Sequence, residues 1–195
     1  REGWDFAETL RYLADKAGVQ LSPRTQESSA DESRKEALRQ VLEEAVQYFR
    51  RQMLETDEGR QALDYLHQRG LSDETIKIWG LGYAPSSWNA LGSALQRKGY
   101  NQSLLESAGL ITLREDGTSY DRFRQRLMFP IRDTYGKMAG FGGRILFSED
   151  QTAAKYINSP RTDLFDKGGL LYGLDMARRE IRKSEQAVIV EGYMD

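Results

Sequence analysis

The pattern of apolar residues changes at Gly109, and this change limits the possible folds more than any other feature. Before Gly109, apolar residues recur at spacings of three and four, as they do along one face of a helix. After Gly109, short runs alternate between apolar and polar residues, as they do in strands. The sequence therefore predicts an α+β chain with a helical N-terminal half followed by a small mixed or antiparallel sheet built from hairpins.

Two longer helices are predicted first. Residues Asp5–Ala17 carry apolar side chains on one face, and Gly18 follows as a stop signal. The polar segment Ser22–Ser33 is interpreted as an exposed linker, and Ser33 with Glu36 as a capping box. The helix behind it has the clearest periodicity in the chain. Its apolar face consists of Leu38, Val41, Leu42, Ala45, Phe49 and Met53.

Shorter elements follow, each between recognisable start and stop residues. Four helices are expected, capped by Thr56, Ser72, Ser86 or Ser87, and Asn101, and ending at Gly70, Gly80, Gly99 and Gly109. Asp116-Gly117 predicts a hairpin turn, and Thr134–Gly136 predicts a second one. Pro130 suggests an edge strand or a bulge. A helix is expected over Leu174–Lys183, and a last strand over Ala187–Glu191.

Composition limits the possible functions. The chain has no cysteine, so it has no disulfide and no thiolate metal site, which suits a cytoplasmic protein. It has no apolar run near the length of a membrane span and no secretory signal at its start. The net charge of −2 gives no overall attraction to nucleic acid. Any site for a polyanion must therefore arise from local clustering of charge.

Such a cluster begins at Asp121. Arg122, Arg124 and Arg126 alternate, so a strand would direct all three to one face, with Phe123 on the core side. Two interpretations remain open at this point. The arginines can form a solvated outer face of the sheet, or they can face a polyanion. Further along, GFGGR (Gly140–Arg144) permits close backbone approach to a phosphate, although glycine in a strand more often marks a bulge or a twist.

Two more residues, His67 and Glu191, are considered as candidate functional residues. His67 is the only histidine, so neither a histidine-based metal site nor a Ser-His triad can be built, and a surface position near a helix end is expected. Glu191 follows the apolar run Ala187–Val190. A strand of this kind is buried on both faces in a parallel sheet, and ligands bind at the carboxyl ends of such strands. Glu191 could act there as a general base or assist a divalent cation.

Several ordered motifs resemble the catalytic core of bacterial DnaG-type primases. The matching blocks, in chain order, are YLHQRGLSDETIKIWGLGYAP (Tyr65–Pro85), YDRFRQRLMFPIRD (Tyr120–Asp133), GFGGR (Gly140–Arg144), KYINSPRTDLFDKGGLLYGL (Lys155–Leu174) and VIVEGYMD (Val188–Asp195). Together they extend over nearly the whole chain. The resemblance implies a DNA-dependent RNA polymerase that makes short RNA primers on single-stranded DNA during replication.

The resemblance also implies a domain organisation. Residues 1–21 would be a linker helix after a zinc-binding domain that this chain lacks. Residues 22–185 would be the N-terminal subdomain of the catalytic core, and residues 186–195 the start of an α/β Toprim domain on its first strand. The implied partners are a single-stranded DNA template, ribonucleoside triphosphates and, through a further domain, the replicative helicase. The implied metals are Mg²⁺ or Mn²⁺ at an incomplete site here, and Zn²⁺ only in the zinc-binding domain.

Site residues follow from the same motifs. Glu191 matches the Toprim glutamate, as the catalytic residue and as one partial ligand of the metal site. The resemblance further implies contacts with DNA or nucleotide by Arg144, Lys155, Lys167, Arg122, Arg124, Arg126 and Asn158. Asp166 stands where the family often has histidine, which would weaken the positive potential at Lys167. The alternatives are a nucleic-acid-binding module without catalysis, or another Toprim protein such as a topoisomerase or nuclease.

Overall fold

The computed structural model describes residues 6–19, 26–147 and 152–194. The chain divides into two compact units, residues 1–34 and residues 35–195. The first unit contains α1 (Phe6–Ala17), which ends at Gly18 in the left-handed conformation (φ 66°), as the sequence predicts. Leu10 and Leu13 on its apolar face are largely exposed. No helix within the described ranges is long and apolar enough to cross a membrane.

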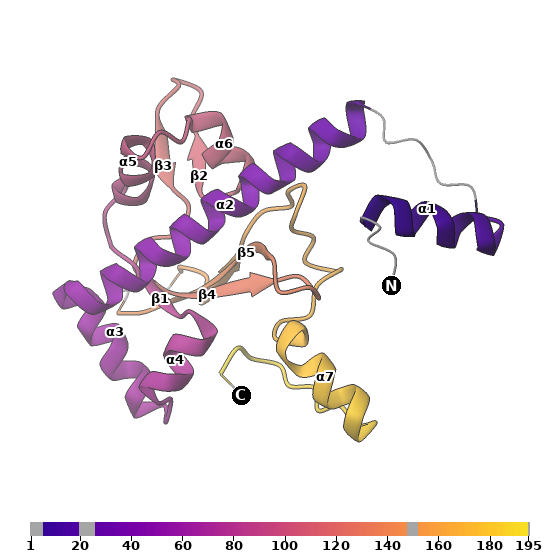
Figure 1. Ribbon diagram of the computed structural model, residues 1–195. Helices are drawn as coiled ribbons and strands as arrows, with labels where there is room; N and C mark the ends of the chain where they lie inside the picture. The colour runs from indigo at the N-terminus through magenta and orange to yellow at the C-terminus, as the bar shows by residue number, and fades with distance from the viewer. Residues whose placement is uncertain (1–5, 20–25, 148–151, 195) are drawn as a thin grey trace. The chain divides into compact units, whose positions relative to one another are not determined.

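The second unit has the predicted α+β class (Figure 1). The long helix α2 (Gln26–Glu55) enters it at Lys35. The helices that follow are α3 (Asp57–Gln68), α4 (Asp73–Trp79), α5 (Ala90–Arg97), α6 (Gln102–Ser107) and α7 (Leu174–Ser184). The strands are β1 (Gly82–Ala84), β2 (Ile111–Leu113), β3 (Ser119–Asp121), β4 (Arg126–Arg132), β5 (Met138–Ile145) and β6 (Tyr156–Asn158).

Both sheets are antiparallel. The larger one has the strand order β1-β4-β5-β6, and β2 pairs with β3 in a separate hairpin. The two predicted turns are confirmed, with Gly117 and Gly136 at positive φ. Pro130 lies in β4, an inner strand of the sheet, beyond the three residues of β4 that pair with β1. Its missing N–H therefore costs no hydrogen bond to β1. The predicted irregularity is present as a register shift between Ile131 and Arg132.

The two faces of the larger sheet are covered differently. The helix α2 lies across one face (Figure 1), where the ring of Phe49 meets that of Phe141 edge-on at 5.4 Å. A Cβ on Gly82 would lie 2.6 Å from the backbone of Phe49, so only glycine permits this approach of strand and helix. The other face, which carries Leu127 and Phe129, packs against α3 and α4. We call it the α3 face.

Most helix starts are confirmed. Thr56, Ser72 and Asn101 each accept a hydrogen bond from a backbone N–H in the first turn of the next helix. The start of α5 differs from the prediction because neither Ser86 nor Ser87 caps it. Ser86 donates instead to Glu58, at 2.7 Å.

The side chain of Asp121 replaces the expected cap of α5. Its two carboxylate oxygens accept the backbone N–H groups of Leu91 and Gly92 at 2.7 and 2.9 Å. Burial raises the pKa of Asp121 to about 6, against the opposing effect of these two hydrogen bonds. The carboxylate therefore connects the β2–β3 hairpin to a helix that precedes it in the chain.

Two predictions about local structure are wrong. Residues 26–33 of the expected linker are helical, so the capping box at Ser33 does not exist, while residues 20–25 lie outside the described ranges. The Ser33 hydroxyl donates to the carbonyl of Ser29 at 2.9 Å, which satisfies a polar side chain inside a helix. The final strand is also absent. Residues 186–190 are irregular, and Val188 is 91% exposed because no described strand pairs with this segment.

Candidate functional site

Arg144 lies near the end of β5, and its side chain is on the α3 face of the sheet. It stands opposite Leu127 of β4 and Tyr156 of β6. Its guanidinium carbon lies 4.7 Å from the ring centroid of Tyr65, in α3, and 6.0 Å from that of Tyr156. Its Nε is buried and has no hydrogen-bond partner among the described residues. Two aromatic rings therefore hold this cation, rather than a carboxylate.

The three glycines before Arg144 create space for aromatic rings. A Cβ on Gly140 would lie 2.8 Å from the ring of Phe165, and a Cβ on Gly142 would lie 2.5 Å from the hydroxyl of Tyr193. On the other face, a Cβ on Gly143 would lie 2.9 Å from the ring of Phe123. The sequence suggested that these glycines let a phosphate approach the backbone. In the described structure, it is aromatic side chains of the protein that approach the backbone of β5.

Tyr193 fixes the segment that follows α7 to the α3 face. Its ring stacks on Phe129 with centroids 4.7 Å apart, and its hydroxyl donates to Oδ1 of Asn158 at 2.8 Å. Burial raises the pKa of the Tyr193 hydroxyl further above neutral pH. The ring of Tyr156, beside Arg144, is 6.0 Å away. Glu191, two residues before Tyr193, is exposed and is thereby tethered to the face that carries Arg144.

Arg122 and Arg126 bind backbone carbonyls. Arg122 donates from Nε and Nη2 to the carbonyl of Asn158, at 3.2 and 2.9 Å. Arg126 is 7% exposed and donates from Nη1 to the carbonyl of Ala154 at 3.0 Å. Burial lowers the pKa of both guanidinium groups. Both arginines thus hold β6 and the loop before it against the sheet.

The prediction that one strand directs three arginines to one face is wrong. Residues 122–125 form no strand, and Gln125 has a φ of 53°, which breaks the alternation. The guanidinium carbon of Arg124 lies 4.1 Å from the ring centroid of Trp88, near the β2–β3 hairpin. Arg126 is in β4 next to Leu127, so its side chain leaves the sheet on the face opposite Arg144.

Residues 48–178 match the family model described as DNA primase catalytic core, N-terminal domain. This match extends over more than half of the chain. The chain belongs to this primase family.

Similar proteins agree with that assignment. The DNA primase of Deinococcus radiodurans is 46% identical over 195 residues, which is 100% of this chain and 32% of that protein. The RNA polymerase domain of Mycobacterium tuberculosis primase DnaG, in complex with double-stranded DNA, is 41% identical with a TM-score of 0.75, over 81% of this chain and 49% of that one. A DnaG primase catalytic domain bound to single-stranded DNA is 39% identical with a TM-score of 0.64, over 76% and 45%.

The chain therefore spans about a third of the length of the curated primases it matches. It spans about half of the solved primase domains.

The two lysines singled out by the primase resemblance are exposed. Lys155 directly precedes β6, and its carbonyl accepts the N–H of Ile145 at 2.9 Å. Lys167 lies in a turn closed by the N–H of Gly169 and the carbonyl of Asp166, at 3.0 Å. Asp166 also forms an ion pair with Arg161 at 3.4 Å. Part of its negative charge is therefore balanced by that arginine rather than by Lys167.

The described residues do not fit a metal centre. Within them, no group of three or more His, Asp and Glu side chains is close enough together to hold a metal ion. Glu191 is exposed, and Asp195 lies outside the described ranges. His67 is partly exposed in the last turn of α3, where its Nε2 lies 2.8 Å from Oδ1 of Asp73, as expected for a surface histidine.

Sequence reasoning missed the aromatic partners of the site. Tyr65 and Tyr193 were not singled out as site residues, although both lie inside the motifs that resemble primases. Their contacts with Arg144 and Asn158 join residues that are far apart in the chain. A detectable signal was the Gly-x-Gly spacing in β5, since two glycines on one face of a strand leave room for two large rings.

Proposed function

We propose that this chain supplies the part of a primase catalytic core that faces the DNA template. The observation that carries the proposal is the setting of Arg144. Its guanidinium is positioned by two rings and has no ion-pair partner among the described residues. A charge that no carboxylate of the described residues neutralises is available to a phosphate, and arginine can bind phosphate with two hydrogen bonds.

The comparisons support the choice of ligand. Primase domains similar to this chain have been solved with double-stranded and with single-stranded DNA. We assign the same ligand class here, with a single-stranded DNA template and ribonucleoside triphosphates as substrates. Lys155 is exposed and directly precedes Tyr156, which pairs with Arg144, so it adds positive charge beside that arginine. Lys167 is exposed further along the chain, and we assign it a contact with DNA or nucleotide. Arg122, Arg126 and Asn158 position β6, and we infer that they act through it.

The chemistry of the proposed reaction is phosphoryl transfer. The 3′-hydroxyl of one ribonucleotide attacks the α-phosphorus of the next triphosphate, a new phosphodiester bond forms, and pyrophosphate leaves. Glu191 would accept the proton of the attacking hydroxyl as a general base. It could also be one ligand of a bound divalent cation, which would make that hydroxyl more acidic. Lys and Arg side chains would neutralise charge on the phosphates.

Divalent cations stabilise such reactions when bound. We place their remaining ligands, together with the zinc-binding and helicase-binding regions, in the part of the primases' length that this chain does not span. We likewise propose that residues 186–195 lead into a Toprim domain, and that residues 1–21 act as a linker.

Primer synthesis by the full-length protein tests the proposal. The protein is mixed with a single-stranded DNA template, radiolabelled ribonucleotides and Mg²⁺, and RNA products are separated on a denaturing gel. We expect short RNA from the full-length protein and none from residues 1–195 alone. Cleavage or relaxation of DNA without RNA synthesis would overturn the assignment and favour the other Toprim activities. Primers made by residues 1–195 alone would contradict the proposal that the reaction needs ligands from other regions of the protein.

A further inference from the structure

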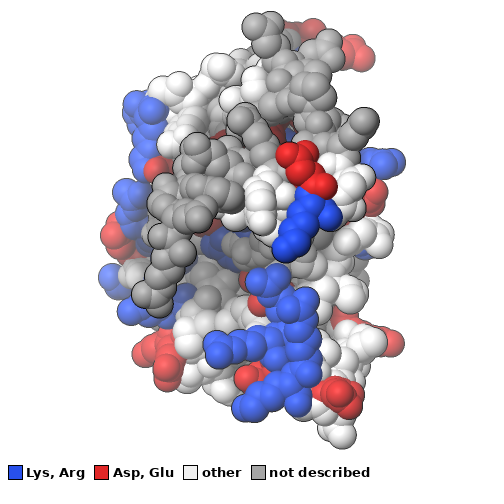
Figure 2. Space-filling view, turned by 45° about the vertical axis from the view of Figure 1, so that its right-hand side comes forward, with Lys and Arg blue, Asp and Glu red and all other residues white. Residues whose placement is uncertain are grey.

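The helix α7 carries a second cluster of positive charge. Its four basic residues line one hollow of about 440 Å³, and no residue of this helix is buried. Figure 2 shows a dense group of Lys and Arg low on the face that it displays, where α7 lies in Figure 1. The residues of this α7 cluster are Arg178, Arg179, Arg182 and Lys183.

Helix stability does not explain the α7 cluster. Arg178 with Arg182, and Arg179 with Lys183, are like charges four residues apart, which destabilise a helix. The helix dipole favours cations only in the last turn, where Arg182 and Lys183 lie. The Nζ atom of Lys183 also lies 3.8 Å from Oε2 of Glu180, as an ion pair. Asp175, three residues before Arg178 and four before Arg179, offsets part of this repulsion. The helix still carries four basic residues against two acidic ones, and an anionic ligand would balance this excess.

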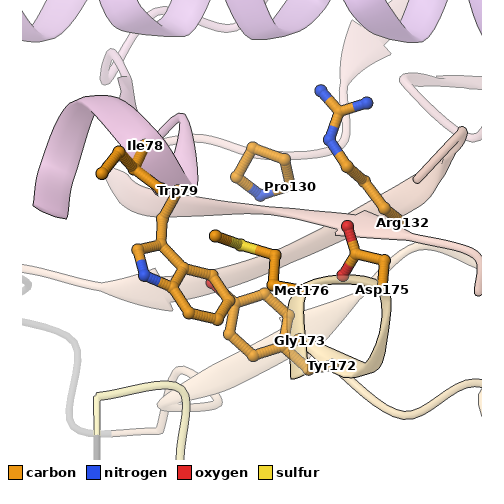
Figure 3. Close-up of a pocket in the computed structure, with 8 residues that line it drawn as sticks. All are labelled: Ile78, Trp79, Pro130, Arg132, Tyr172, Gly173, Asp175 and Met176. Atoms are coloured by element: carbon orange, nitrogen blue, oxygen red, sulfur yellow. The ribbon is translucent and has the colours of Figure 1, made fainter. Parts of the chain in front are cut away.

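The start of α7 is fixed to the rest of the unit. Tyr172 packs on Trp79 of α4 with ring centroids 5.1 Å apart. Gly173 has a φ of 76°, and a Cβ there would lie 2.9 Å from the Trp79 ring. Figure 3 shows the pocket of about 250 Å³ that these residues form with β4 and the first turn of α7, including Met176. The α7 cluster therefore stands on a positioned helix.

An exposed aromatic ring lies next to the cluster. Tyr135, in the turn between β4 and β5, is 79% exposed, and the guanidinium carbon of Arg178 lies 5.8 Å from its ring centroid. Proteins that bind single strands combine cations for the phosphates with exposed rings on which bases stack. An acidic protein surface would use the charges but would not require the ring. The combination favours single-stranded nucleic acid.

We propose that the α7 cluster and Tyr135 form a second contact for single-stranded nucleic acid, separate from Arg144. Met138, just after the turn that holds Tyr135, and Arg144 lie at opposite ends of β5. At about 3.3 Å per residue, this separation is about 20 Å. A long strand can reach both contacts, and a short one only one of them. This contact goes beyond the proposed function, because single-stranded nucleic acid can bind to it whether or not the protein makes RNA.

The test is equilibrium binding of the full-length protein to oligodeoxythymidine of about 20 nucleotides, followed by fluorescence anisotropy at several salt concentrations. Arg179→Ala/Arg182→Ala should lower the slope of log K against log salt by about 1.4, since each phosphate contact on a single strand contributes about 0.7. Tyr135→Ala should weaken binding about tenfold while leaving the slope unchanged, because stacking is not ionic.

A matched control removes two exposed arginines elsewhere. Arg51 and Arg97 line a groove between α2 and α5, on the side of the unit away from α7 (Figure 1). Arg51→Ala/Arg97→Ala should leave the slope at its wild-type value. A wild-type slope in the Arg179→Ala/Arg182→Ala variant would overturn the proposal, as would an equal loss in the control. Binding is measured independently of primer synthesis, so failure of the proposed function would be seen separately.

Discussion

Replacing Glu191 with glutamine should reduce primer synthesis by the full-length protein by about 10²–10⁴-fold, the usual contribution of general acid–base catalysis. Glutamine preserves the size of the side chain but can neither accept a proton nor carry a negative charge. Glu191 is exposed and its segment is anchored through Tyr193, so the substitution should not disturb the fold. Initial rates of RNA synthesis at saturating template measure the effect.

The control for this experiment is Glu185→Gln. Glu185 is also exposed and lies six residues earlier, at the end of α7. The Glu185→Gln substitution therefore removes the same charge from the same part of the chain. Its rate should match that of the unsubstituted protein, and both variants should bind template normally. If Glu191→Gln instead lost template binding, or if Glu185→Gln were equally slow, the catalytic assignment would fail.

Gly142→Val should displace Tyr193 from the sheet and, with it, the segment that bears Glu191. Even the first side-chain carbon would lie 2.5 Å from the Tyr193 hydroxyl, so the ring cannot remain on β5. The lost stacking and hydrogen bond should lower the free energy of unfolding by about 2–3 kcal/mol. Misplacement of a reacting group by about 1 Å can cost about 10²-fold, and primer synthesis should fall by a similar factor.

A double-mutant cycle with Tyr193→Ala shows whether this mechanism holds. If valine acts only by displacing the ring, the double variant should be no less stable in urea and no slower than Tyr193→Ala alone. Simple addition of the two effects would mean that valine disturbs β5 itself and that the ring is not what it displaces. Tyr193→Phe keeps the ring and loses one hydrogen bond, so a cost of about 1 kcal/mol is expected.

Local signals predicted much of the fold. The caps at Thr56, Ser72 and Asn101 and the turns at Gly117 and Gly136 involve residues adjacent in sequence. The clear apolar face of α2 predicted a helix that packs on the core. Each of these features is decided within a few residues, which is why sequence patterns reveal them.

The errors arose where distant residues decide the structure. Asp121 caps α5 from about 30 residues away, so no local pattern pointed to it. The apolar run before Glu191 predicted a buried strand, but a strand depends on neighbours, and the described strands do not pair with it. Alternation of arginines implied a strand, yet a left-handed residue at Gln125 ended the alternation before β4 began.

The candidate site was predicted in part. Motif resemblance identified Arg144, but it could not show that Tyr65 and Tyr156 hold its guanidinium. The same motifs grouped Arg144 with Arg126, although register places them on opposite faces of the sheet. A motif records which residues occur together, and only the pairing of strands determines which of them share a face.

If the Arg144 guanidinium binds a phosphate of the template, its removal should change the salt dependence of template binding. Arg144→Ala in the full-length protein should lower the slope of log K against log salt by about 0.7. Arg114→Ala is the matched control, because Arg114 also lies over two rings, those of Trp88 and Tyr120, but on the β2–β3 hairpin. We expect a reduced slope for Arg144→Ala alone. An unchanged slope with normal priming, or an equal reduction in both variants, would contradict it.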